Sequence, residues 1–385
     1  MNVEKILQLI PESELEFLSA ETKVDHQVKK LSGALVFKLI LFSMLNSQRV
    51  SLRVMEQFFC SASFRNFSGT EQETKYNSIR DRIATINSEY FHRIFMLLFE
   101  RFNKELNEQQ AILKVDTTCI AASAKLVDWS LKVSSQVKGD NQRHLKVGMG
   151  VKGSLPCRVE IFTNHNAASE DHTIPQVIFN CAESGSSIVT FDRGVQSRKT
   201  FDKLSNNNIV FVSRLRKTSV FKIVKQNALD EQSENDTLTI NEDCICHLKN
   251  QFQKWTENTF RVIKATIRKT NEPIWFITNE TTLSAKEITC IYKKRWEIEV
   301  FFKFLKQHLN LSHLVARNEN GIKVMIYMTV ILAILLSVYK QKNKIQTYKI
   351  AKLRFEIQLD NMMMKEVVIL CGGNPDNAPH LWNST

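Results

Sequence analysis

The chain has 385 residues, of which 43% are hydrophobic, 24% charged and 9% aromatic, and these ordinary globular proportions exclude wholesale disorder. Only 11 glycines and 6 prolines occur, which excludes collagen-like and proline-rich scaffolds and argues against a many-turned β-sandwich. Lysine and arginine outnumber the acidic residues 52 to 40, and the net charge of +12 favours a polyanionic partner. The eight scattered cysteines form no disulfide framework and no secretory signal is visible, so we expect a cytoplasmic protein.

Residues 1–108 are predicted to form helices, because apolar residues recur at helical spacing in residues 35–42 and 90–102. Basic residues are spread along the whole region. This charge suits a DNA-binding module, although a solvated helical surface explains it equally well. We predict an all-α N-terminal domain over residues 1–108, with DNA binding as its expected role.

After residue 108 the pattern changes to short apolar runs separated by turn signals. The first predicted strand carries Asp116 inside an apolar frame, and a later one ends at Asp192. A helix is expected around residues 175–180, between these two acids. Such an order is typical of an RNase H-like sheet, so we predict an α/β catalytic domain over residues 109–320. The predicted strands are residues 112–120, 144–151, 157–163, 187–194, 209–213 and 273–278.

Three further segments complete the prediction. Residues 216–270 alternate β-branched and polar side chains, which indicates a mostly β insertion in the catalytic domain. A single long helix is expected at residues 284–309, followed by a C-terminal helical region at 321–385. Residues 324–339 are uncharged over 16 residues. Because a membrane-spanning helix needs about 20 residues, we expect this segment to be a helix buried in a soluble core.

The predicted helix at residues 284–309 carries a stripe of polar side chains. At about 100° per residue, Tyr292, Arg295, Glu299 and Lys306 fall in one narrow sector beside an apolar flank. A carboxylate next to an arginine, a lysine and a phenol suits a site that binds a metal ion and a phosphate. The alternative is a surface helix with an i,i+4 ion pair between Arg295 and Glu299.

Two acids on predicted strands favour the catalytic interpretation of that stripe. Asp116 and Asp192 each lie in or at the end of an apolar strand, where an unpaired carboxylate is costly. With Glu299 they would supply oxygen ligands for two Mg²⁺ or Mn²⁺ ions, which activate water or a 3′-hydroxyl for in-line attack on phosphorus. Glu297 points about 200° away from Glu299 on a helix, so Glu299 is the predicted third ligand.

The spacing Tyr292-x2-Arg295-x3-Glu299-x6-Lys306 resembles the Tyr-Arg-Glu-Lys signature of DDE transposases of the "insertion sequence four" family. Asp116-Thr-Thr and Phe191-Asp192-Arg-Gly resemble the two aspartate motifs of that family, and the resemblance covers about residues 110–320. It implies that Asp116, Asp192 and Glu299 form the catalytic triad and bind Mg²⁺ or Mn²⁺. It also implies that Tyr292, Arg295 and Lys306 contact phosphates near the scissile bond.

The resemblance further implies partners and a reaction sequence. Enzymes of this kind act as homodimers on the terminal inverted repeats of their own element, in similar members form hairpin ends, and join the ends to target DNA. A bacterial cytoplasmic, nucleoid-associated protein without a membrane is therefore expected. Trp275 lies where a related transposase stacks a tryptophan on a flipped base, although a core aromatic is an equal alternative. Arg193 and Arg214 are expected DNA contacts, or else structural ion pairs.

Two other classes of function compete with a transposase. A structure-specific nuclease on the same fold would cut without strand transfer, and it would not need the stripe of Tyr292, Arg295 and Lys306. A decayed or repurposed DNA-binding copy would lack one of the three acids, and all three are present. The sequence therefore favours a transposase that cleaves and joins DNA by two-metal phosphoryl transfer.

Overall fold

The computed structural model describes residues 6–7, 10–106, 112–122, 131–132, 143–163, 169–181, 187–229 and 237–378. The chain forms two compact units. Unit 1 comprises Met1–Glu105, Ala122–Asp128 and Lys303–Thr385, and unit 2 comprises Leu106–Ala121 and Trp129–Phe302. Unit 1 thus combines segments from both ends of the chain. The division into three domains at residues 108 and 320 stays a prediction.

Helices and turns make up residues 10–106, all of which the structure describes, and no strand occurs among them. Side-chain hydroxyls start several of these helices. Ser32, for example, accepts a hydrogen bond from the backbone N–H of Leu35, which satisfies a donor that the first helical turn leaves open. The N-terminal helices are α2 (Glu12–Thr22), α3 (Gly33–Asn46), α4 (Leu52–Cys60), α5 (Ala62–Ser68), α6 (Tyr76–Thr85) and α7 (Ser88–Leu106).

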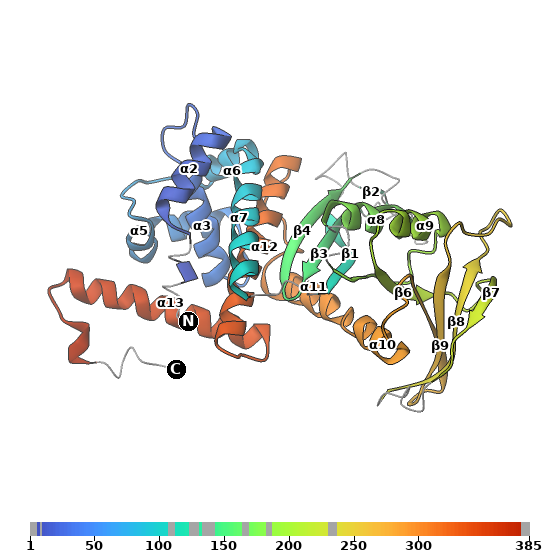
Figure 1. Ribbon diagram of the computed structural model, residues 1–385. Coiled ribbons are helices and arrows are strands. Elements are labelled where there is room, and N and C mark those ends of the chain that lie inside the picture. Colours follow the sequence, from blue (N-terminus) through green and yellow to red (C-terminus); the bar gives the residue numbers. More distant parts are fainter. Residues whose placement is uncertain are drawn as a thin grey trace. The chain divides into compact units, whose positions relative to one another are not determined.

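The C-terminal part of unit 1 contains α12 (Glu319–Lys342), α13 (Tyr348–Leu370) and a short 3₁₀ helix, η2 (Pro375–Asn377) (Figure 1). Helix α12 is long and apolar enough to cross a membrane by composition, but 89% of its apolar window is buried inside the protein. It packs against α3, α6 and α13. The segment at residues 324–339 is therefore a buried core helix, as the absence of charge over only 16 residues predicted.

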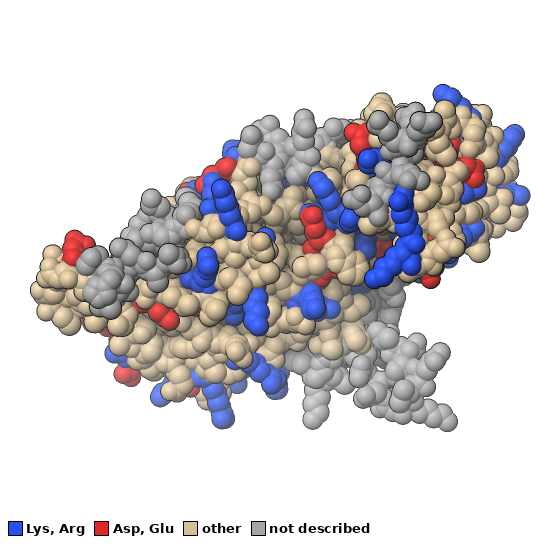
Figure 2. Space-filling view, turned by 90° about the horizontal axis from the view of Figure 1, so that it is seen from below, with Lys and Arg blue, Asp and Glu red and all other residues tan. Residues whose placement is uncertain are grey.

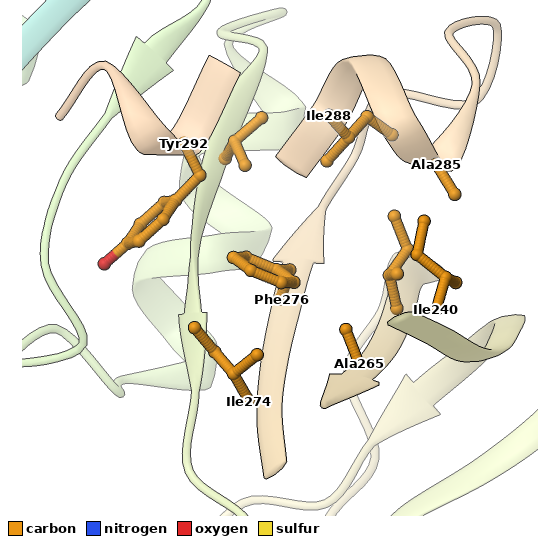
Figure 3. Packing of buried hydrophobic residues seen from close by; sticks show 9 residues of the cluster. Ile240, Ala265, Ile274, Phe276, Ala285, Ile288 and Tyr292 are labelled. Atoms are coloured by element: carbon orange, nitrogen blue, oxygen red, sulfur yellow. The ribbon is translucent and has the colours of Figure 1, made fainter. Parts of the chain in front are cut away.

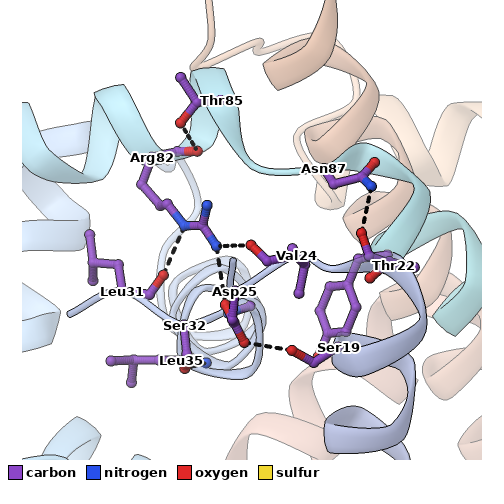
Figure 4. Close-up of polar contacts among 12 residues, drawn as sticks. Ser19, Thr22, Val24, Asp25, Leu31, Ser32, Leu35, Arg82, Thr85 and Asn87 are labelled. Atoms are coloured by element: carbon purple, nitrogen blue, oxygen red, sulfur yellow. Dashed lines mark hydrogen bonds and ion pairs between the residues drawn. The ribbon is translucent and has the colours of Figure 1, made fainter. Parts of the chain in front are cut away.

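A half-buried arginine of α6 joins this helix to the loop between α2 and α3. Arg82 of α6 donates hydrogen bonds to the carbonyl oxygens of Val24 and Leu31, each at 2.8 Å (Figure 4). Its guanidinium also lies 3.2 Å from the carboxylate of Asp25, which in turn accepts a hydrogen bond from the Ser19 hydroxyl at 2.6 Å. These bonds satisfy loop carbonyls that would otherwise be unpaired, so they hold the loop against α6.

Unit 2 is built on one large mixed sheet. The strand order is β2-β3-β1-β5-β6-β10-β9-β8-β7, with β4 paired to β3. Strands β1, β5 and β6 run parallel to one another, whereas β6 to β10 and the pairs beyond it are antiparallel. The strands are β1 (Leu113–Ala122), β2 (Leu131–Lys132), β3 (Arg143–Lys152), β4 (Leu155–Phe162), β5 (Val189–Thr190), β6 (Phe211–Leu215), β7 (Phe221–Gln226), β8 (Leu238–Leu248), β9 (Phe260–Ile267) and β10 (Glu272–Thr278).

Helices cover both faces of this sheet (Figure 1). Helices α8 (Glu170–Cys181) and α9 (Arg198–Asn206) lie on one side, and α10 (Ala285–Lys293) lies on the other. The contact of α10 is apolar: Ala285, Ile288 and Tyr292 pack on side chains of β6, β8, β9 and β10, including Phe276 (Figure 3). Because this packing buries one face of Tyr292, it fixes the direction in which the phenol points.

The prediction of a single helix over residues 284–309 is wrong. The chain forms α10 and then α11 (Trp296–His308), with a turn between them. In that turn the N–H of Arg295 donates to the Tyr292 carbonyl at 2.9 Å, and the N–H of Ile298 donates to the Arg295 carbonyl at 3.1 Å. These bonds reach back three residues instead of four, which tightens the turn. The apolar spacing continues across the break, so the pattern of side chains did not reveal it.

Candidate active site

Strand pairing brings Asp116 and Asp192 to neighbouring positions. In the parallel pair of β1 and β5, Lys114 lies opposite Thr190. Asp116 and Asp192 each follow two residues later, so the two aspartates lie at the same level of the sheet on neighbouring chain segments. Each carboxylate accepts the N–H of the next residue at 2.7 Å, from Thr117 and from Arg193. The two carboxylates also repel each other, and this repulsion contributes to raising the pKa of Asp116.

The turn between α10 and α11 places two predicted phosphate ligands beside these acids. The hydroxyl of Tyr292 donates to Oδ1 of Asp192 at 3.5 Å. The guanidinium of Arg295 lies over the Tyr292 ring, 5.7 Å from its centroid. Both side chains are at most 9% exposed. Burial is the main cause that raises the pKa of Tyr292 above its usual range, so the phenol is a hydrogen-bond donor at neutral pH.

Arg295 lies between two of the three predicted catalytic acids. Its Nη1 atom is 3.6 Å from Oδ2 of Asp116, and its Nη2 atom donates to Oε1 of Glu299. Its Nε and Nη1 atoms are buried and make no hydrogen bond with the described residues. A buried donor without a partner is costly, so this guanidinium has capacity to bind a further acceptor such as a phosphate oxygen.

The Asp116 carboxylate has an unusually high pKa. Its pKa is raised to about 6, chiefly by burial; Asp192 and Glu170 also raise it, whereas the Thr117 N–H and Arg295 lower it. The folded chain therefore binds this proton more tightly than the unfolded chain does. A raised pKa contributes stability at low pH that is lost as the pH rises through about 6.

This shift predicts a pH dependence that one variant isolates. In metal-free buffer, the free energy of unfolding of the wild type relative to Asp116→Asn should fall by up to about 3 kcal/mol between about pH 4 and pH 6. Urea unfolding of both proteins across this range measures it. Parallel pH profiles of the two proteins would contradict the burial of Asp116.

Glu170 is an acid of this site that the sequence pattern did not single out. It lies in the first turn of α8 and contributes to raising the pKa of Asp116. A Cβ atom placed on Gly194 would overlap Oε2 of Glu170, so the glycine admits this carboxylate. An acid in a first helical turn is common for electrostatic reasons alone, which is why no sequence signal separates Glu170 from other such acids.

Gly194→Ala should destabilise the protein through this one contact. We expect a loss below about 1 kcal/mol, because the new methyl group displaces only the flexible end of the half-buried Glu170 side chain. The double variant Gly194→Ala/Glu170→Ala should recover most of the loss, since the shortened side chain leaves room. Thermal unfolding of the single and double variants gives the coupling energy, and purely additive losses would contradict the contact.

A second pair of charges ties the helix of Glu299 to the strand of Asp116. Lys114 lies on the same face of β1 as Asp116, two residues earlier, and its side chain is 4% exposed. Its ammonium donates to Oε2 of Glu297 at 2.6 Å and to the carbonyl of Gly153. Glu297 therefore pairs with Lys114, and this contact fixes the first turn of α11 on β1.

A pocket of about 640 Å³ opens beside Asp192 and collects three other predicted residues. Arg193, Arg214 and Trp275 line it together with Glu170. The Trp275 ring is not a deeply buried core aromatic; it is half-buried and borders the pocket. The ammonium of Lys264 lies 4.9 Å from its centroid. The structure thus brings Arg193, Arg214 and Trp275 together near one predicted catalytic acid.

One predicted phosphate ligand, Lys306, belongs to the other compact unit, and the described acids of unit 2 form no ready metal site. Lys306 lies in the C-terminal half of α11, which belongs to unit 1, whereas the other predicted site residues belong to unit 2. Among the residues that the structure describes, no three Asp, Glu, His or Cys side chains lie close enough together to hold a metal ion. The donors nevertheless fit Mg²⁺ or Mn²⁺ in kind, because all three predicted ligands offer hard carboxylate oxygens. A cation, Arg295, already lies between Asp116 and Glu299.

Carboxylates and an arginine close together on the inner strands of a mixed sheet and an adjoining helix suit the binding of metal ions and phosphate. Comparison with known proteins identifies the family. Residues 108–336, more than half of the chain, match the transposase DDE domain. The chain belongs to this family and is a DDE-type transposase.

Several proteins are similar to the chain over about two thirds of their length. A candidate transposase named y4zB from Sinorhizobium fredii is 25% identical over 66% of this chain and 68% of that protein. A candidate transposase for the insertion sequence element IS4SA from Synechocystis is 27% identical over 69% of this chain and 72% of that protein.

A solved structure is also similar, but weakly. The cryo-EM structure of the piggyBac transposase synaptic complex with hairpin DNA aligns with 95% of this chain and 82% of that chain. The TM-score is 0.48 and the sequence identity is 9%.

Proposed function

We propose that this chain is the transposase of an insertion sequence, which cleaves the ends of its own element and joins them to target DNA. The observation that supports the proposal is that Arg295 contacts both Asp116 and Glu299, with Asp192 near enough to Asp116 to raise its pKa, in a chain of the transposase DDE family. We place it in the "insertion sequence four" family by its Tyr-Arg-Glu-Lys signature. The excision would follow a cut-and-paste course with hairpin ends, carried out by a homodimer.

Each acid would have a defined task in this reaction. Asp116, Asp192 and Glu299 would hold two Mg²⁺ or Mn²⁺ ions, which supply activation of water or a 3′-hydroxyl and neutralise charge at phosphorus. Arg295 would leave its position between Asp116 and Glu299 as the metal charge replaces its own. Its unpaired Nε and Nη1 atoms would then bind phosphate oxygens.

The other predicted residues would orient the DNA. Tyr292 would donate its hydroxyl to a phosphate oxygen, and Lys306 would add a second positive charge there. Trp275, which borders the pocket beside Asp192, would stack on a base released from the duplex. Arg193 and Arg214 line the same pocket and would hold the neighbouring backbone.

We extend the proposal to the architecture. The catalytic domain would be RNase H-like, supported by the parallel strands β1, β5 and β6 with an acid on β1 and another just after β5. The helices of residues 1–108 would form a DNA-binding domain. Lys and Arg side chains are scattered over the face of the molecule that Figure 2 shows. Within residues 1–108 the Asp and Glu residues equal them in number, so the DNA-binding role of these helices rests on the family resemblance.

Cleavage of a defined DNA end tests the proposal. Purified protein is incubated with a labelled duplex that carries one end of the element, with and without Mg²⁺, and the products are resolved on a denaturing gel. We expect metal-dependent nicking at the end, followed by hairpin and strand-transfer products. Cleavage without any transfer product would indicate a structure-specific nuclease. Binding without cleavage of either end would indicate a decayed DNA-binding protein.

A further inference from the structure

A second cavity in unit 2 adjoins the pocket beside Asp192. It has a volume of about 570 Å³ and lies between the start of α9, the turn after β6 and the turn at residues 249–253. We call it the α9 cleft. It shares Arg216 and Thr218 with the pocket beside Asp192, so the two cavities have a common wall.

Cations dominate the α9 cleft. Arg198, Lys199, Arg216 and Lys249 line it, and Asp171 is its one acidic residue among those described. The Asp171 carboxylate is already engaged, because its Oδ1 atom accepts the backbone N–H groups of Gln196 and Ser197 at 2.6 and 2.8 Å. The cleft therefore carries a surplus of positive charge that its own acid does not neutralise.

The cations of the cleft are of two kinds. The guanidinium of Arg198 is built into the wall: it donates to the Gln196 carbonyl at 3.0 Å and to the Ser219 hydroxyl at 2.8 Å. The side chains of Lys199 and Arg216 are exposed and form no hydrogen bond or ion pair with an acid among the described residues. Burial lowers the pKa of Arg198, and repulsion from nearby Arg216 lowers it further, although Asp171 acts in the opposite direction.

Like charges held close together without a counter-ion are the mark of an anion-binding surface. An aromatic side chain adds to this pattern at the rim, where Phe252 is 73% exposed. Lys249 lies nearby with its ammonium 5.5 Å from the centroid of Trp255. Basic side chains interleaved with exposed aromatic rings suit nucleic acid, whose phosphates bind the cations and whose bases stack on the rings.

We propose that the α9 cleft binds the DNA backbone and continues the path of the DNA away from the catalytic acids. This inference rests on the proposed function, and it adds a surface that the predicted site residues do not include. The common wall of the two cavities favours a polymer over a small anion. A strand that leaves the pocket beside Asp192 across Arg216 would next meet Lys199 and Lys249.

DNA binding without metal tests the proposal independently of cleavage. The full chain and the variant Lys199→Met/Lys249→Met are titrated with a fluorescent duplex in EDTA over a series of salt concentrations. Methionine keeps the apolar stem of each lysine, including its contact with Trp255, and removes the charge. The matched control is Lys269→Met/Lys286→Met, which removes two exposed lysines of the same unit outside both cavities.

We expect the cleft variant to bind DNA roughly tenfold to a hundredfold more weakly at physiological salt. The slope of log K against log salt should fall by about 0.9 for each lost phosphate contact. The control should change neither quantity appreciably. Arg216→Met should weaken binding in the same direction, because Arg216 lines both cavities.

Two outcomes separate this proposal from the proposed function. If the wild type cleaves ends in Mg²⁺ but the cleft variant binds DNA as the control does, the α9 cleft is not a DNA site and the transposase proposal stands. If the cleft variant loses affinity while the wild type cleaves no end, the cleft is a DNA site on a protein without the proposed activity. Thermal unfolding of each variant shows whether a loss of binding reflects a loss of folding. If Lys199→Met/Lys249→Met does not fold, the DNA affinity of Arg216→Met tests the cleft instead.

Discussion

Asp116→Asn, Asp192→Asn and Glu299→Gln should each abolish metal-dependent cleavage of the element ends. Each substitution replaces a charged oxygen ligand by an amide of nearly the same shape. If these carboxylates hold the metal ions, the loss of several kcal/mol of transition-state stabilisation corresponds to a rate decrease of at least about a thousandfold. Initial cleavage rates of a labelled end duplex at saturating Mg²⁺ measure the effect.

DNA binding serves as the control for this prediction. The three variants should retain the affinity of the wild type for the same duplex in EDTA, because removing a carboxylate does not remove a phosphate contact. Glu297→Gln is the matched variant on the same helix turn, since its carboxylate pairs with Lys114. It should retain far more activity than Glu299→Gln. Wild-type rates for any of the three acids would remove that residue from the proposed triad.

Arg261→Met should cause the largest loss of stability that we expect in unit 2. Arg261 and Asp243 form a buried ion pair, with three hydrogen bonds of 2.9, 3.2 and 2.6 Å, and their side chains are 7% and 2% exposed. Removing the arginine leaves the Asp243 carboxylate buried without a counter-charge, with the Asn227 amide as its remaining side-chain donor at 2.9 Å, and the loss of the buried partner costs about 3–5 kcal/mol. The arginine also donates to the Leu283 carbonyl at 2.6 Å, just before α10, so its loss loosens the start of that helix.

Urea unfolding of three variants separates the causes of that loss. Arg261→Met/Asp243→Leu should be more stable than Arg261→Met alone, because the apolar pair leaves no buried charge. Lys269→Met, an exposed change of the same length, should lie within about 0.5 kcal/mol of the wild type. A loss below about 1 kcal/mol for Arg261→Met would mean that water reaches Asp243.

Local patterns predicted the strands of the sheet well. The apolar frame around Asp116 forms β1, but the strand predicted over residues 187–194 is wrong in its length, because β5 spans only Val189–Thr190 and Asp192 lies beyond its end. The predicted strands at residues 144–151 and 157–163 correspond to β3 and β4, and the turn between them contains Gly153 with a φ of 57° that other residues rarely adopt. Each of these features depends on neighbours a few residues away, which a single sequence contains.

Features set by long-range contacts could not be predicted in this way. The break between α10 and α11 comes just after Tyr292, which packs against Phe276, 16 residues earlier in the chain. The role of Glu297 depends on Lys114, 183 residues away, and the presence of Glu170 beside Asp116 depends on how α8 lies on the sheet. Helical spacing excluded Glu297 from the triad, but it gave no indication of its partner.

The assembly of unit 1 from both ends of the chain constrains the order in which the protein folds. Helices α3 and α6 pack against α12, and the side chain of Asn320 at its start donates to the carbonyl of Ile86 at 2.6 Å. During synthesis, α12 leaves the ribosome only after the whole of unit 2. The apolar side chains of α3 and α6 that pack against α12 therefore stay exposed while unit 2 is synthesised. The packing of α12 into the helical core is among the last steps of folding.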